Sequence, residues 1–143
     1  MIDLIVFSVD NNRYALSIDN VKRIIQAVEL TDIPSAHEFI DGMMSYEDNV
    51  IKILNFRKLI GLEPHPDEAK DIEDNTMKFL FYENEDINFA IKVDKIDDIV
   101  HIEENDIMNS DDKHNTNEFL ELSGVLDIDS VLINVVKTIH LPS

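Results

Sequence analysis

The sequence predicts a mainly β fold built from two similar halves, and three observations support this. Residues 14–25 recur near residues 89–100, a second pair of matching segments follows in the same order, and short alternating apolar segments run along the chain. Many short strands at this spacing are typical of barrels or sandwiches with little helix. We take the halves as about 1–62 and 76–143, joined by an acidic linker at 63–75.

The first repeat matches Tyr14–Ile25 with Phe89–Val100 at a constant offset in numbering (89 − 14 = 75). In each copy, apolar alternation over five residues gives way to apolar spacings of three and one. This change predicts a half-buried strand followed by a short helix, whose buried stripe in the first copy is Val21, Ile24 and Ile25. Asp19 and Asp94 stand where a helix N-cap is expected.

The second repeat runs from Gly42 through Val50–Ile60 and from Gly124 through Val131–Ile139. Its asparagines, Asn55 and Asn134, align at a slightly larger offset (134 − 55 = 79), so short insertions or deletions separate the matched blocks. We expect these two asparagines to satisfy backbone groups of the barrels. Two matching blocks in one order favour a duplication.

The remaining elements follow from local patterns. In the first half, Asn11-Asn12 predicts a tight turn, and Ser35 with Glu38 predicts a capping box before a brief turn. The strands expected in this half are Leu4–Val9, Arg13–Ile18, Met43–Tyr46 and Val50–Phe56. In the second half, the strands expected are Met77–Tyr82, Ile87–Val93 and Val131–Val136, with a long polar loop at Glu103–Asn117.

Length and charge restrict the class of protein. A chain of 143 residues is one domain in size, and halves of about 60 residues would be marginal alone, so we expect one cooperative unit. The net charge is −18, with −3 in residues 1–62 (nine acids, six bases) and −15 in residues 63–143 (21 acids, six bases). Such a surface repels phosphate, which argues against nucleic acid and anionic membrane as partners.

No feature of the sequence indicates catalysis, a metal site or a cofactor. The chain has no cysteine, no G-x-S-x-G motif, only three isolated glycines, and five histidines without ligand spacing. Its acidic clusters lack the D-x-D-x-D-G spacing of a calcium loop. The N-terminus lacks a basic region and no apolar run could span a membrane, so we expect a cytoplasmic protein that is not an enzyme.

The order of motifs resembles the CheW family, the coupling proteins of bacterial chemotaxis, over nearly the whole chain. The similarity lies in Tyr14–Ile18 before Val21-Lys22-Arg23-Ile24, then Ile33-Pro34, Phe39–Gly42 and Met43–Gly61. The resemblance implies two five-stranded SH3-like barrels around a shared core, packed as one unit. It also implies a non-enzymatic scaffold that joins chemoreceptor cytoplasmic tips to the regulatory domain of the histidine kinase CheA.

The chain departs from the family where the family carries charge. The usual N-L-R-G turn is Ser45-Tyr46-Glu47-Asp48 here, the usual proline of the next strand is Lys52, and the aspartate after it is Asn55. The usual V-x-E-I reads Val21-Lys22-Arg23-Ile24, so a glutamate has become Arg23 and an arginine Glu47. Either the two form a reversed ion pair, or they are two independent surface changes. The residues expected at the partner contact are Arg23, Met43, Met44, Ser45, Tyr46, Glu47 and Asp48.

The leading hypothesis is therefore a divergent chemosensory adapter that binds two partners at once. The alternative is a decoy or regulator of the same fold, which binds only one of these partners or serves another sensory system. A third class, a small-molecule or metal-binding domain, would reveal itself by ligand-dependent thermal stabilisation.

Overall fold

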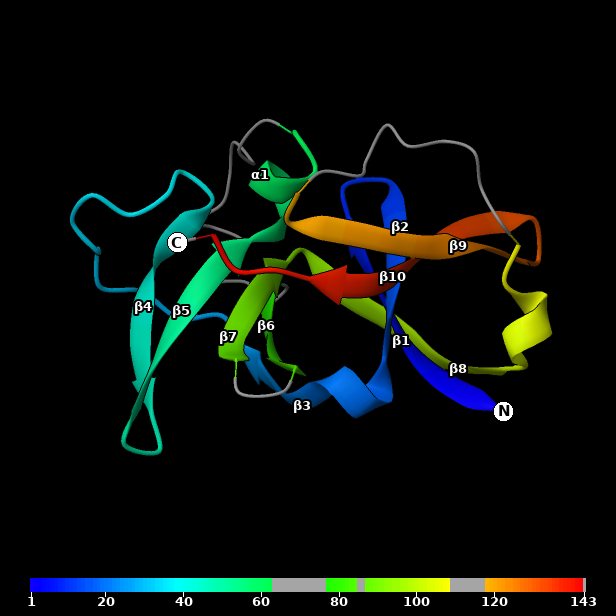
Figure 1. Cartoon of the computed structure of the whole chain (residues 1–143), viewed down its shortest axis with the longest axis horizontal. Helices are drawn as coiled ribbons and strands as arrows, with labels where there is room; N and C mark the ends of the chain where they lie inside the picture. The colour runs from blue at the N-terminus through cyan, green and yellow to red at the C-terminus, as the bar shows by residue number, and fades with distance from the viewer. Residues whose placement is uncertain (63–76, 85–86, 109–117, 143) are drawn as a thin grey trace.

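The computed structural model describes residues 1–62, 77–84, 87–108 and 118–142, and it contains two five-stranded sheets (Figure 1). The strand order is β8-β1-β2-β10-β9 in the first sheet, barrel A, and β3-β6-β7-β5-β4 in the second, barrel B. The described strands are β1 (Ile2–Val9), β2 (Asn12–Ser17), β3 (Val21–Gln26), β4 (Ile40–Tyr46), β5 (Asn49–Asn55), β6 (Lys78–Asn84), β7 (Ile87–Val93), β8 (Lys95–Ile102), β9 (Leu120–Ile128) and β10 (Val131–Ile139). The helical turns are η1 (Ile18–Asn20), α1 (Phe56–Leu59) and η2 (Glu104–Asp106). The predicted fold class is confirmed.

Each sheet is closed by the segment that follows one of its edge strands. Thr31, beyond β3, exchanges backbone hydrogen bonds of 3.0 and 2.9 Å with Met43 of β4. Met108, beyond β8, does the same with Val125 of β9, at 2.8 Å in both directions. These bridges join the two edge strands of each sheet. Closing a sheet into a barrel in this way leaves fewer unpaired strand edges.

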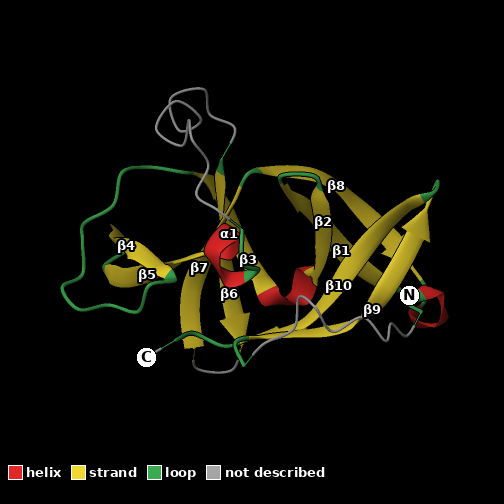
Figure 2. Cartoon of the chain, turned by 90° about the horizontal axis from the view of Figure 1, so that it is seen from above, coloured by secondary structure: helices red, strands yellow, loops and turns green. Residues whose placement is uncertain are grey.

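The strands of the two sequence halves are exchanged between the barrels (Figure 2). Barrel A takes β1 and β2 from the first half and β8–β10 from the second, whereas barrel B takes β3–β5 and β6–β7. The two strand orders match position by position, so that β3, β6, β7, β5 and β4 of barrel B correspond to β8, β1, β2, β10 and β9 of barrel A. In each pair the two strands are five places apart in the chain. This internal symmetry supports the proposed duplication, and it means that neither half forms a barrel alone.

The pairing corrects one detail of the repeat. Val135 pairs with Ala15 and Ile53 pairs with Ala90, so the closing strands correspond at a larger offset (135 − 53 = 82). Gly42 and Gly124 share this offset (124 − 42 = 82). The predicted alignment of Asn55 with Asn134 is therefore wrong. One shared residue type misled the comparison, because the apolar positions around it are interchangeable.

Three clusters of buried residues make up the core. One lies inside barrel A and one inside barrel B, while the largest is shared by strands of both barrels. Strand β1 shows why: Leu4 and Val6 join the barrel A cluster, and Ile5, Phe7 and Val9 join the shared cluster. The half-buried strand predicted at Tyr14–Ile18 is likewise buried at Tyr14, Ala15 and Leu16, because the outer face of the barrel is covered by the other barrel.

The predicted helix over Val21–Ile25 is wrong. The chain makes the single turn η1, capped by Ser17 rather than Asp19, and then forms β3, which pairs with β6 from the second half. In the second copy, Asp94 caps no helix and leads into β8. The local spacing of apolar residues favoured helix, but pairing with β6, a strand distant in the sequence, decided the outcome.

The two predicted hairpins of the first half are confirmed, with small shifts. Glu47-Asp48 forms a two-residue turn between β4 and β5, with φ of 49° and 67°. Asp129-Ser130, where no turn was predicted, joins β9 to β10 in the same way, with φ of 51° and 69°. The β1–β2 turn is Asp10-Asn11, one residue earlier than expected.

Other expectations were wrong or cannot be compared. Ser35 has φ of 59° and caps no helix; instead His37 Nδ1 accepts the N–H of Phe39 at 3.1 Å. The linker at 63–75 and most of the loop at Glu103–Asn117 lie outside the described residues. Among the residues that the structure describes, no helix is long and apolar enough to cross a membrane.

Candidate functional site

The hairpin β4–β5 carries six of the seven residues expected at the partner contact. Its side chains alternate between two faces, as strand geometry requires. Met44 and Tyr46 pack against the core of barrel B, whereas Ser45 lies exposed on the opposite face. Glu47 and Asp48 form the exposed turn. The predicted set is therefore divided between core packing and surface.

Arg23, the seventh residue, reaches the hairpin from β3. Its Nη2 lies 3.7 Å from Oε1 of Glu47, and its guanidinium lies 5.1 Å from the centre of the Tyr46 ring. The side chains of Arg23 and Glu47 are 46% and 66% exposed, so solvent screens the ion pair, which contributes about 0–1 kcal/mol. The pair does little for stability. It does place a positive charge on the β3 side of the hairpin end and a negative charge at the hairpin turn.

This end of barrel B forms a groove, the hairpin groove, with a volume of about 280 Å³. Its rim carries Lys22, Arg23, Glu47, Asn49 and Asn88, and its apolar lining includes Val50, Ile51, Phe81 and Phe89. The exposed lining is more polar than apolar, with charged and amide groups beside largely buried apolar side chains, a mixture that suits contact with another protein.

The hairpin groove contains residues that the sequence did not single out. Val50 is 64% exposed, but single exposed hydrophobic residues are common on protein surfaces, so nothing in the sequence marked it. Phe81 and Asn88 come from β6 and β7, far away in the sequence, and no local pattern places them beside the hairpin.

Barrel A has a groove of its own, the serine groove, of about 360 Å³. Its residues are Ile2, Leu4, Ser17, Asn20, Glu104, Ile107, Ser123, Val135, Val136 and Lys137. The offsets of the two repeats match Ser17 with Lys92 and Ser123 with Asp41 (92 − 17 = 75; 123 − 41 = 82). In barrel B, Lys92 and Asp41 form an ion pair at that place. Two small serines in barrel A leave the corresponding space open.

The two asparagines of the second repeat contact backbone groups, as expected. Oδ1 of Asn55 accepts the N–H of Lys58 at 3.2 Å and caps α1, while its Nδ2 donates to Asp41 at 3.0 Å. Nδ2 of Asn134 donates to the carbonyl of Arg13 at 3.4 Å. Within the described ranges, no group of three or more His, Cys, Asp or Glu side chains is placed to hold a metal ion.

Known proteins share this architecture and sequence pattern. The CheW-like domain family matches residues 3–140. The chemotaxis protein CheW of Thermotoga maritima is 23% identical over 113 residues, covering 78% of this chain and 70% of that protein. The chemotaxis protein CheW of Bacillus subtilis is 23% identical over 133 residues, covering 93% and 81%.

A solved structure has the same fold. The crystal structure of the scaffolding protein TtCheW from Thermoanaerobacter tengcongensis gives a TM-score of 0.82 at 22% identity, covering 95% of this chain and 84% of that chain. The family match extends through both barrels, from β1 to the end of β10. The chain therefore belongs to the CheW-like domain family.

Proposed function

We propose that this protein is a non-enzymatic adapter of a bacterial chemosensory complex, which couples chemoreceptor cytoplasmic tips to a CheA-type histidine kinase in the cytoplasm. Membership of the family, and relatives named as chemotaxis and scaffolding proteins, support the general role. The observation that carries the adapter mechanism is that each barrel has its own groove. An adapter needs two surfaces that can be occupied together.

Bivalent binding gives such a protein its effect without chemistry. Once one partner occupies one barrel, a second partner on the other barrel is held near the first at a high effective concentration. The core shared by the barrels makes them one body, so both partners would be held in a defined geometry.

The Arg23–Glu47 pair would choose among partners at the hairpin groove. Charges at an interface rim contribute to association rate and to the rejection of wrong partners more than to affinity. A partner that docks here must offer a negative group near Arg23 and a positive group near Glu47. The order of these charges is reversed relative to the family pattern, which would restrict the chain to its own partners.

Charge reversal at the groove tests this proposal. We expect Glu47→Arg to weaken binding of the regulatory domain of the cell's own kinase or of its receptor fragment by roughly tenfold (about 1.4 kcal/mol), because a positive charge then meets the partner's positive group. Adding Arg23→Glu restores an opposite-charge pair but in the family's order, so a partner selected by the order of the charges should not regain its affinity. Isothermal titration calorimetry with each partner measures both effects.

A matched control lies outside both grooves. Glu118, which precedes β9, is exposed and lines neither groove. Glu118→Arg makes the same charge change and should leave both affinities unaltered. Equal losses for Glu47→Arg and Glu118→Arg would mean that only the overall charge matters, and the hairpin groove would not be the contact.

A further inference from the structure

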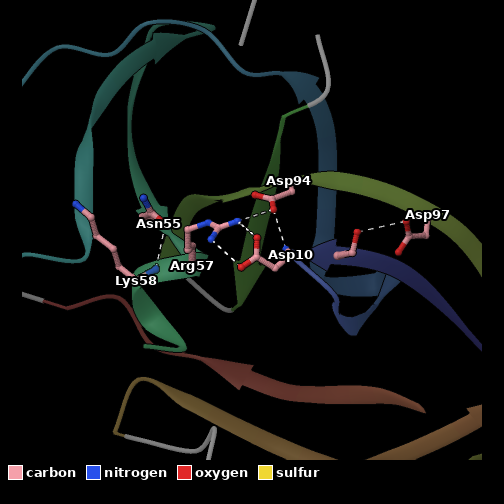
Figure 3. A network of polar contacts seen from close by, with 7 residues as sticks. Asp10, Asn55, Arg57, Lys58, Asp94 and Asp97 are labelled. Carbon is pink, nitrogen blue, oxygen red and sulfur yellow. Dashed lines mark hydrogen bonds and ion pairs between the residues drawn. The ribbon is translucent and has the colours of Figure 1, made fainter. Parts of the chain in front are cut away.

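Arg57 lies where three chain segments from both barrels meet (Figure 3). It belongs to α1, directly after β5 of barrel B. Asp10 is the first residue of the β1–β2 turn of barrel A, and Asp94 lies between β7 and β8, where the chain passes from barrel B to barrel A. We call this group the Arg57 clasp.

The clasp is tightly connected. Nη1 of Arg57 donates to Oδ2 of Asp10 at 2.9 Å, and Nη2 donates to Oδ1 of Asp10 and, at 2.9 Å, to Oδ2 of Asp94. The backbone N–H of Asp10 donates to the same Asp94 oxygen at 2.8 Å. The guanidinium thus holds one carboxylate with two nitrogens and the other with one. Arginine's planar fork gives such contacts a fixed direction.

Burial makes the clasp obligatory for Arg57. Its side chain is only 8% exposed. Burial by itself lowers the pKa of Arg57, but the hydrogen bond to Asp10 and the charge of Asp94 outweigh this and raise the pKa, so the group stays charged. A buried charge that loses its partner is costly, so the three segments are expected to move together.

The shared core joins the barrels, but its contacts are apolar and carry no direction of their own. The clasp adds contacts of fixed direction to that core. Another polar link is the hydrogen bond from the N–H of Ile139 in β10 to the hydroxyl of Tyr82 in β6, at 3.2 Å. Of these two links, the clasp is the charged one with several hydrogen bonds.

We propose that Arg57 is a positioning residue whose clasp on Asp10 and Asp94 fixes the orientation of barrel A relative to barrel B. The clasp thereby sets the separation of the hairpin groove from the serine groove. The claim that the clasp fixes the orientation of the barrels rests on the contacts alone. The claim that two partners are thereby held in one geometry rests on the proposed function.

A distance measurement across the barrels tests the proposal. The chain has no cysteine, so Lys52→Cys on β5 and Glu121→Cys on β9, both exposed, allow one spin label on each barrel. Double electron–electron resonance then gives the distribution of distances between them. We expect a narrow distribution in the labelled parent, and a broadened or shifted one when Arg57→Met removes the clasp.

The neighbouring residue supplies the control. Lys58 lies on the same α1 turn, but its ion pair, 3.4 Å long, is with Asp41 of β4, so both partners belong to barrel B. Lys58→Met should leave the distribution as in the parent. If Arg57→Met does not fold, Asp10→Asn replaces it, because this variant keeps the size of the side chain at position 10 and the contact between Arg57 and Asp94. Asp10→Asn should also broaden the distance distribution, but by less than Arg57→Met.

The result that overturns the proposal is a folded Arg57→Met or Asp10→Asn variant, verified by circular dichroism, whose distribution equals that of Lys58→Met. A lower melting temperature with an unchanged distribution would also overturn it, because Arg57 would then only stabilise the fold. The measurement uses no partner. Failure of the chain to bind kinase or receptor would contradict the proposed function and leave this result standing.

Discussion

Two buried tyrosines differ in what their hydroxyl groups contact. Tyr82 accepts the N–H of Ile139, whereas the hydroxyl of Tyr14 has no hydrogen-bond partner among the described residues. Both side chains lie in the shared core. A buried polar group without a partner destabilises the folded state, and a paired one leaves its partner unsatisfied when it is removed.

This difference predicts opposite results for the same substitution. Tyr82→Phe strands the N–H of Ile139 and should lower the free energy of unfolding by about 1 kcal/mol. Tyr14→Phe removes an unpaired hydroxyl and should leave that free energy unchanged or raise it. Urea denaturation followed by circular dichroism measures both. A loss for Tyr14→Phe as large as for Tyr82→Phe would contradict this interpretation of the shared core.

The buried Tyr14 also gives stability a dependence on alkaline pH. Burial raises the pKa of Tyr14 from its ordinary value of 10.0 to about 12. Between these values the unfolded chain releases the proton while the folded chain keeps it, so the free energy of unfolding falls as pH rises from 10 towards 12. Comparing unfolding at about pH 9 and about pH 11 in the parent and in Tyr14→Phe isolates this effect. An identical decrease in both would assign it to other groups.

At the scale of single residues, prediction succeeded where two positions could be compared with the family pattern. The placing of Arg23 and Glu47 together could be proposed from two departures of opposite sign, and the two side chains do lie 3.7 Å apart. Asn88 and Phe81 could not be found this way, because they approach the hairpin only through long-range strand pairing. The role of the predicted contact residues in binding stays a prediction.

At the scale of elements, the bridges that close the barrels depend on two glycines. A Cβ on Gly124 would lie 2.2 Å from the carbonyl oxygen of Met108, and one on Gly42 would lie 2.7 Å from that of Thr31. Both oxygens belong to the bridging residues. The close approach of two backbones therefore explains why glycine stands at both positions of the second repeat.

Substituting alanine at these glycines should open the bridges. We expect Gly124→Ala to lower the free energy of unfolding by about 1–3 kcal/mol or more, and Gly42→Ala by somewhat less, since backbone rather than a flexible side chain must move. Gly61→Ala is the control: a Cβ there meets nothing within 4 Å, although its φ of 84° costs about 1–2 kcal/mol for alanine. Thermal unfolding of the three variants gives the comparison. A smaller loss for Gly124→Ala than for Gly61→Ala would argue against the steric explanation.

Element prediction failed at one informative place. The spacing of Val21, Ile24 and Ile25 suits a helix, yet the segment is β3, with Ile24 partly exposed. Hydrophobic spacing indicates which residues favour burial, and over six residues it separates helix from strand poorly. The two hairpins of the first half were predicted well because short polar turns, Asp10-Asn11 and Glu47-Asp48, separate alternating apolar segments.

At the scale of the whole molecule, the duplication seen in the sequence supports the observed symmetry but not the exchange of strands. A repeat indicates that two copies fold alike; it does not say with which copy an edge strand pairs. Here β3 joins the barrel of β6 and β7, and β8 joins the barrel of β1 and β2. The chain crosses between barrels at Ser17–Asn20 and at Asp94. These crossings make the two barrels one body, which an adapter requires.

The measurement that tests the adapter most directly is the mass of the complex formed with both partners. The purified chain is mixed with the regulatory domain of the kinase and a receptor signalling fragment from the same cell, and the mass of each product is measured by light scattering. We expect one species whose mass is the sum of all three. Two binary complexes that never combine, with both partners shown to be active, would contradict the adapter and indicate a regulator that binds one partner at a time.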